Sequence, residues 1–313
     1  MGLDGRGVLS DAEWERLRPF LPVSNGRCGR WRDHRQVIDG ILHRVRTGVH
    51  WRDLPERFGP WKTVYERHRL WSADGTWERL LQLVRAGVDA AGEIDWDVAV
   101  DSTIVRAHQH AAGARTDPAR TYRVKGGRSS GTPGRNGMAE SCRPAGGGGA
   151  GGEGLGRSRG GFTSKIHLSA DGRCRPLSLI VTPGQRADCT QFVPVLEKIR
   201  VPRQGVGRPR KKPDSVTADK AYSNGPCREF LRRRGVRHTI PERADSQAAR
   251  LRKGSRGGRP PGFDEARYKK RNTVERAINK LKNSRAVATR YDKRGYVFLG
   301  TVTAAALVIW LRA

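Results

Sequence analysis

The sequence predicts a mixed α/β fold preceded by a helical region, and three observations support this. Residues 10–90 carry apolar side chains at the 3.6-residue period of helices. From residue 94, short runs rich in Val, Ile and Ala alternate with helical segments. The chain has 313 residues, enough for one large domain or two modest ones. We therefore expect a helical region over residues 1–92 and an α/β domain over residues 93–313.

The helical region has clear start and stop signals. Ser10 followed by Glu13 forms a capping box that opens the first helix. Asp33 is placed to cap a second helix, whose apolar period stops at Gly48. Two further helices follow, after a short helical stretch and a Gly-Pro turn. The predicted helical segments begin at Ser10 and then cover residues 33–48, 53–58, 61–71 and 76–88.

The segments 53–58 and 61–71 resemble a helix-turn-helix. In that interpretation the second helix enters a DNA major groove, with Lys62, Arg67 and Arg69 as candidate contacts. An ordinary small helical bundle with a solvated basic face explains the same pattern. Spacing alone favours the bundle, and both alternatives stay open.

The second region contains strand and helix patterns in alternation. The two strands over 164–169 and 176–182 are expected to form a hairpin joined at Asp171-Gly172. The apolar stretch 297–311 is too short and too interrupted for a membrane span, so we expect a buried core helix. The other predicted strands cover residues 94–105, 215–222 and 236–241, and the other predicted helices cover 188–199, 226–234 and 264–283.

Two segments are not expected to fold on their own. Residues 126–161 contain 15 glycines in 36 positions, and residues 243–262 are rich in Arg, Gly and Pro. Neither segment has enough apolar surface to offset the entropy lost on ordering. We therefore predict a disordered Gly-rich insertion over about 126–161 and an Arg/Gly/Pro-rich loop over about 243–262. Their arginines are candidates for ordering on nucleic acid, and a solvated linker remains the alternative.

Composition indicates a polyanionic partner. The chain has 61 Lys and Arg against 31 Asp and Glu, which gives a net charge of +30 and a pI of about 11.2. No basic amphipathic anchor or signal peptide opens the chain, so a membrane partner is not expected. The five cysteines are widely spaced without a Cys-x-x-Cys pair, as is typical of a reducing cytoplasm.

Three acids are candidates for a metal site. Asp101 and Asp219 each follow a short apolar run that reads as a strand, where an acid at the edge of a buried sheet is costly without a cation. Glu275 lies in the predicted helix 264–283. Three carboxylates from different elements can hold the divalent ions that catalyse phosphodiester cleavage. His108 and His110 lack a third soft ligand nearby, so oxygen ligands are favoured over a histidine site.

Glu275 is surrounded by groups that bind phosphate. At about 100° per residue, Tyr268, Arg271, Glu275 and Lys282 fall within an arc of about 60° on one helix face. An apolar stripe runs beside this face, so Glu275 is expected at the boundary of the core. Taken alone, Arg271 and Glu275 are an i, i+4 pair of the kind common on helix surfaces.

These residues resemble the DDE transposases of bacterial insertion sequences, in the groups with a Tyr-x2-Arg-x3-Glu-x6-Lys signature. Here the signature is formed by Tyr268, Arg271, Glu275 and Lys282, and supporting stretches lie around Asp101, residues 155–161 and Asp219. The resemblance implies a ribonuclease-H-like core and Mg²⁺ or Mn²⁺, two ions, held by the three acids. It implies that the signature residues Tyr268, Arg271 and Lys282 position the element end.

The resemblance implies a transposase that cleaves the ends of its element and joins the 3′ ends to target DNA. Its expected partners are double-stranded DNA and at least one further protomer, in a bacterial cytoplasm in association with the nucleoid. Two alternatives stay open. One is a catalytically inactive DNA-binding relic or repressor of the element, and the other is a structure-selective nuclease on a similar core.

Overall fold

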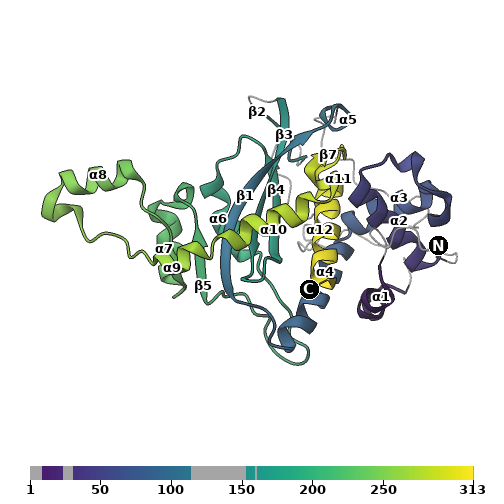
Figure 1. Ribbon diagram of the computed structural model, residues 1–313, viewed down its shortest axis with the longest axis horizontal. Coiled ribbons are helices and arrows are strands. Elements are labelled where there is room, and N and C mark those ends of the chain that lie inside the picture. Colours follow the sequence, from purple (N-terminus) through teal and green to yellow (C-terminus); the bar gives the residue numbers. More distant parts are fainter. Residues whose placement is uncertain (1–8, 24–30, 114–152, 159–160, 313) are drawn as a thin grey trace, which may run out of the picture.

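The computed structural model describes residues 9–23, 31–113, 153–158 and 161–312. A mixed β-sheet lies at the centre, with helix α10 across it, and the N-terminal helices gather at one end (Figure 1). Helix α8 lies at the opposite end of the long axis. Buried apolar residues of the N-terminal helices and of the sheet belong to one continuous hydrophobic cluster. The two predicted regions therefore share a core.

The sheet has seven strands in the described residues. Strand β3 pairs antiparallel with β1 along one edge and with β4 along the other, where β2 also pairs. Strands β5 and β6 extend the sheet beyond β1 in parallel. The strands are β1 (Asp97–Ala107), β2 (Gly156–Ser158), β3 (Gly161–Ala170), β4 (Pro176–Pro183), β5 (Ser215–Ala218), β6 (Arg237–Thr239) and β7 (Thr289–Arg290).

This strand order is β4-β3-β1-β5-β6, with an antiparallel meander followed by two parallel strands. It is the arrangement of a ribonuclease-H-like sheet, so the predicted fold class is confirmed. The predicted hairpin is confirmed as β3 and β4, with Asp171 accepting backbone hydrogen bonds in the turn. The predicted strand 215–222 is wrong beyond Ala218, because the chain turns at Asp219 into the short helix η5 (Lys220–Tyr222).

The N-terminal helices form where the sequence predicts them. The capping box of Ser10 and Glu13 opens α1, and the Asp33 side chain caps α2. Gly48 ends α2 with a φ of 71°, a left-handed conformation that favours glycine. The helices are α1 (Asp11–Leu17), η1 (Arg18–Phe20), α2 (His34–Thr47), η2 (Trp51–Asp53), η3 (Glu56–Phe58), α3 (Trp61–Ala73) and α4 (Thr76–Ala90).

The C-terminal helix α12 (Gly295–Leu311) is almost wholly buried, which confirms the predicted core helix. It contacts α2, α3 and α4 and so joins the end of the chain to its beginning. A Cβ on Gly300 would lie 2.0 Å from Ser72 Oγ, so glycine permits the close approach of α12 to α3. In the described part of the chain, no helix combines the length and apolar character needed to cross a membrane.

The predicted single helix 264–283 is divided into α9 (Glu265–Lys269) and α10 (Asn272–Lys282). Across the break, backbone bonds run from residue i to residue i−3, as from Arg271 to Tyr268. The side chain of Arg271 at the break binds two carboxylates. Periodicity alone did not reveal the break because α9 has only five residues, fewer than two helical turns, and buries none of them.

The prediction of disorder for residues 243–262 is wrong, because this segment forms α8 (Ala244–Arg252) and η6 (Gly254–Gly257). Neither has a buried residue, and an Arg250–Glu242 ion pair of 3.0 Å fastens α8 to the chain before it. Of the predicted Gly-rich insertion, residues 126–152 and 159–160 lie outside the described residues, whereas Gly156–Ser158 forms β2.

The remaining helices connect or cover the strands. The predicted helix 188–199 forms as η4 and α6, and the predicted helix 226–234 forms as α7. These helices are α5 (Gln109–Ala112), η4 (Asp188–Gln191), α6 (Phe192–Glu197), α7 (Gly225–Arg233) and α11 (Arg285–Ala288).

Candidate active site

Asp101 lies in the middle of β1, with its side chain 21% exposed. Its carboxylate accepts a hydrogen bond of 3.2 Å from Arg271 Nη1 and one of 2.8 Å from the backbone N–H of Ser102. Burial raises the pKa of Asp101, the negative charges of Asp219 and Glu275 raise it further, and Arg271 and Ser102 act in the opposite direction. The two other predicted acids therefore lie near enough to affect Asp101.

Arg271 links Asp101 to Glu275. Its Nη1 atom contacts Asp101, and its Nη2 atom donates to Glu275 Oε1. The apolar stripe of α10 is buried against the sheet, as predicted. The Glu275 side chain is 47% exposed, so it lies further into solvent than expected. The buried residues of α10 are Val274, Ala277, Ile278 and Leu281.

Asp219 follows β5, the strand that pairs in parallel with β1 beside Asp101. Its carboxylate accepts a hydrogen bond of 2.9 Å from the backbone N–H of Ala221 and so caps η5. Burial raises the pKa of Tyr222, and the charges of Asp188, Asp101 and Asp219 add to this increase. Tyr222 thus lies among carboxylates from three separate segments.

The carboxylates suit a divalent cation by donor type, since Mg²⁺ prefers oxygen ligands. The negative charges of Asp219 and Glu275 both raise the pKa of Asp101, so the other two acids lie near it. Among the described residues, however, no three His, Cys, Asp or Glu side chains are arranged closely enough to hold an ion. The guanidinium of Arg271 lies between two of the three acids.

Of the two other signature residues, Lys282 contacts β1 and Tyr268 lies near Arg271. Lys282 Nζ donates a hydrogen bond of 3.2 Å to the backbone oxygen of Ile104, three residues beyond Asp101. Burial lowers the pKa of Lys282. The Arg271 guanidinium lies 5.7 Å from the centre of the Tyr268 ring. Arg271 and Lys282 thus both contact the strand that carries Asp101, and the roles of the signature residues remain predictions.

Sequence analysis missed a fourth acid, Asp188. It accepts hydrogen bonds of 2.7 Å from Ser102 Oγ and 2.9 Å from Lys165 Nζ, and so supports the residue next to Asp101. Burial lowers the pKa of His167, which faces Asp188, to about 4. The overlooked signal is the alternation of Lys165 and His167 in an otherwise buried strand, where charged residues need partners.

The three candidate DNA contacts of α3 differ in position. Lys62 is exposed, and Arg69 forms an ion pair of 3.2 Å with Glu66. Arg67 is only 7% exposed, and its guanidinium lies 3.9 Å from the centre of the Trp31 ring. The prediction of Arg67 as a DNA contact is therefore wrong, because the side chain packs inside the helical region. Lys62 and Arg69 remain predictions.

The fold and the acids near Asp101 narrow the possible classes of protein, and comparison with known proteins identifies the family. A model of the "Transposase DDE domain" matches residues 93–310, and a model of the "Putative transposase of IS4/5 family" matches residues 9–81. The chain therefore belongs to the bacterial DDE transposases of the IS4/5 type. The predicted family is confirmed, whereas the four-residue signature is not itself tested by these matches.

The chain is also similar to individual proteins. The chain is 31% identical over 151 residues to the "Putative transposase for insertion sequence element IS6501" of Brucella ovis, which covers 48% of this chain and 100% of that protein. It is 41% identical over 129 residues to an uncharacterised protein, y4sN, of Sinorhizobium fredii, which covers 41% of this chain and 91% of that protein. Among solved structures, a Mos1 transposase paired-end complex has 12% identity and a TM-score of 0.23, covering 84% of this chain and 83% of that one.

Proposed function

We propose that this transposase binds the ends of its insertion element, cleaves phosphodiester bonds there with a divalent metal, and joins the 3′ ends to target DNA. The observation that carries the proposal is the approach of Asp101, Asp219 and Glu275 from β1, the end of β5 and α10. Asp219 and Glu275 each lie more than one hundred residues beyond Asp101 in the chain, yet their charges raise the pKa of Asp101.

Each residue has a proposed role. Asp101, Asp219 and Glu275 would supply the oxygen ligands for Mg²⁺ or Mn²⁺, with two ions expected. When bound, the metal would neutralise charge on the scissile phosphate and make a water or hydroxyl nucleophilic. Arg271 and Lys282 would contact phosphates of the element end, and Tyr268 would support Arg271. The Asp188–Ser102 bond of 2.7 Å would keep the backbone beside Asp101 in place.

The proposal is tested with purified protein and DNA that carries the element's own ends, found as inverted repeats beside the gene. We expect Asp101→Ala, Asp219→Ala and Glu275→Ala each to abolish strand cleavage and to leave end binding largely intact. Glu265→Ala, which removes an exposed acid of α9, is the matched control and should cleave normally. Substantial cleavage by any one of the three active-site variants would contradict the proposal.

The second candidate is a DNA-binding relic or repressor without catalytic activity. It is favoured by one observation, the ion pairs that the Arg271 guanidinium forms with both Asp101 and Glu275. The two candidates differ in their response to metal. A ligand that binds only the folded state at 100 times its Kd stabilises that state by about 2.7 kcal/mol. A repressor whose acids no longer bind metal would gain no stability from added Mg²⁺.

Bringing two element ends together requires at least two protomers on DNA, and we propose a dimer or larger assembly there. The charge of +30 would favour this assembly on DNA over assembly without it, because unneutralised protomers repel each other.

A further inference from the structure

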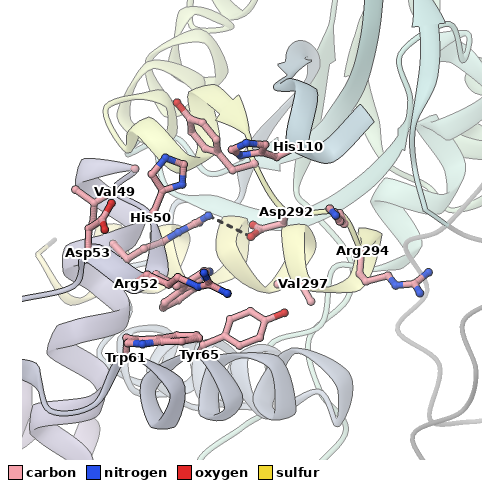
Figure 2. A pocket seen from close by; sticks show the side chains of 15 residues that line it. Val49, His50, Arg52, Asp53, Trp61, Tyr65, His110, Asp292, Arg294 and Val297 are labelled. Carbon is pink, nitrogen blue, oxygen red and sulfur yellow. Dashed lines mark hydrogen bonds and ion pairs between the residues drawn. The ribbon is translucent and has the colours of Figure 1, made fainter. Parts of the chain in front are cut away.

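A cavity of about 530 Å³ lies between the N-terminal helices and the connection from β7 to α12. Its walls come from η2, α3, α5 and the residues before α12 (Figure 2). None of these residues belongs to the candidate active site. The volume falls within the range of about 300–1,000 Å³ that is usual for small-molecule sites.

Aromatic rings line much of this cavity. Trp61 and Tyr65 lie four residues apart on α3, so both rings reach the same wall (Figure 2). The centres of the Trp51 and Tyr65 rings lie 5.4 Å apart. Tyr291, from the C-terminal part of the chain, also lines the cavity. Aromatic side chains of this kind stack on the faces of unpaired bases without regard to base identity.

Arg44 supplies unused hydrogen-bond donors to the same cavity. It is 3% exposed, and its Nη2 atom forms a 3.2 Å ion pair with Asp292. The Arg44 guanidinium also lies 4.9 Å from the centre of the Trp51 ring. Its Nε and Nη1 atoms are buried, and they have no hydrogen-bond partner among the described residues. A buried donor in this state requires an explanation, and an acceptor on a bound ligand provides one.

The cavity is positively charged. Arg44, Arg52, Lys293 and Arg294 outnumber Asp53 and Asp292 by two charges. Within the described residues, Arg52 and Lys293 form no ion pair with a carboxylate, and both are exposed at the opening. Figure 2 shows Arg52 above the rings of Trp61 and Tyr65. The site thus combines stacking surfaces, an internal donor pair and cations at its rim.

We propose that this cavity binds one unpaired nucleotide of a DNA strand. The base would stack on Trp61 and Tyr65 and accept hydrogen bonds from Arg44, while Arg52 and Lys293 would contact its phosphate. Extruding a nucleotide costs unpairing energy, which is smallest at an end or where the base already lacks a partner. This inference rests on the proposed function, because it assumes that DNA is the partner.

The cavity is placed to act on the same DNA as the active site. Strand β1 carries Asp101 and ends at Ala107, and His110 at the cavity wall follows in α5. At about 3.3 Å per residue, the strand covers roughly 20 Å from Asp101 to Ala107. This is about six base pairs of duplex axis, so one bound DNA molecule can reach both sites.

The test compares three duplexes of equal length and arbitrary sequence, without metal. One is blunt, one has three unpaired nucleotides at an end, and one has three abasic nucleotides there, which keep the phosphates but lack the bases. We expect the wild-type protein to bind the unpaired duplex more tightly than the other two. Trp61→Ala should weaken binding of the unpaired duplex by about 5- to 100-fold, the range for loss of a base stack, and change blunt binding less than about twofold.

Further variants keep the result interpretable. Arg52→Ala changes an exposed residue. Because Arg52 is proposed to contact the phosphate, this variant should weaken binding of the unpaired and abasic duplexes more than binding of the blunt duplex, even where Trp61→Ala folds poorly. Trp61→Phe should restore most of the preference. Arg46→Ala removes an exposed arginine of α2 outside this cavity and should affect all three duplexes equally.

Several outcomes would overturn the inference. One is equal affinity of the wild type for the unpaired and abasic duplexes, and another is an equal effect of Trp61→Ala and Arg52→Ala on all three duplexes. If free deoxyadenosine monophosphate bound as tightly as the unpaired duplex and displaced it, the cavity would be a site for free nucleotides and not for a nucleotide of a DNA strand. Equal affinity for all three duplexes would leave the proposed function in place. A protein that bound none of the duplexes would contradict both the proposed function and this inference.

Discussion

Arg271 is the residue whose contacts differ most from its sequence pattern. Its spacing indicates an ordinary pair with Glu275 on a helix surface, and that pair is present. The same guanidinium also reaches Asp101, 170 residues earlier in the chain. Helical spacing predicts only neighbours on the same helix, so this second contact was not predictable. The positive charge of Arg271 stands between two acids that are expected to bind metal.

We predict that Arg271→Gln increases the affinity for Mg²⁺ in the absence of DNA. Removal of the guanidinium leaves Asp101 and Glu275 without their shared positive partner. A divalent ion then no longer competes with Arg271 for these two carboxylates. The expected gain is about tenfold, or about 1.4 kcal/mol, and titration calorimetry measures it.

Lys282→Gln is the matched control for this prediction. It removes the same charge from the same helix, but Lys282 Nζ contacts the backbone oxygen of Ile104 and no carboxylate. Its effect should be less than about threefold. An unchanged or weaker Mg²⁺ affinity for Arg271→Gln would show that Arg271 does not compete with metal.

At the scale of elements, sequence patterns located most helices and strands, but only some of their ends. Caps were visible at Ser10, Asp33 and Gly48, because capping depends on local residue types. The division of 264–283 into α9 and α10 depends on contacts with β1, which lie far away in the sequence. The alignment of Asp101 with the end of β5 similarly depends on strand order.

The packing of α12 on α3 depends on one glycine, and this can be tested. A Cβ on Gly300 would lie 2.0 Å from Ser72 Oγ and 2.6 Å from Ser72 Cβ. We predict that Gly300→Ala lowers the free energy of unfolding by about 1–3 kcal/mol because the helices must move apart. Urea unfolding measures the change.

Two variants complete this test. Ser72→Gly in the Gly300→Ala background should recover part of the loss, because it removes the atoms in collision. Gly87→Ala, within α4, is the control, since its added Cβ would meet only the Gln204 side chain at 3.4 Å. That change should be neutral or stabilising by up to about 1 kcal/mol. A Gly300→Ala variant as stable as wild type would refute the close-packing account.

At the scale of the whole molecule, charge predicts how DNA binding responds to salt. A net charge of +30 in 313 residues provides many Lys and Arg side chains that can displace counterions. With six to ten phosphate contacts, we expect affinity for element-end DNA to fall by about 10³ to 10⁵ between 50 and 200 mM salt. Fluorescence anisotropy at several salt concentrations measures the slope. An affinity that does not change with salt would exclude these phosphate contacts.

The family could be predicted from the sequence, because the signature residues and the stretches around Asp101 and Asp219 resemble it. The role of the three acids remains a prediction that the resemblance implies. Sequence analysis did not reach Asp188 or the cavity beside Arg44, since both are assembled from segments far apart in the chain. It also placed Arg67 on a DNA-binding surface, because a basic helical position looks the same whether it faces solvent or a tryptophan.

The central claim is that Asp101, Asp219 and Glu275 bind divalent metal together. The most direct measurement is calorimetric titration of Mn²⁺ into the wild-type protein and into Asp101→Asn, Asp219→Asn and Glu275→Gln. We predict saturable binding that approaches two ions per chain for the wild type, and at least about a tenfold loss of affinity in every variant. Wild-type affinity in any one of the three variants would contradict the claim.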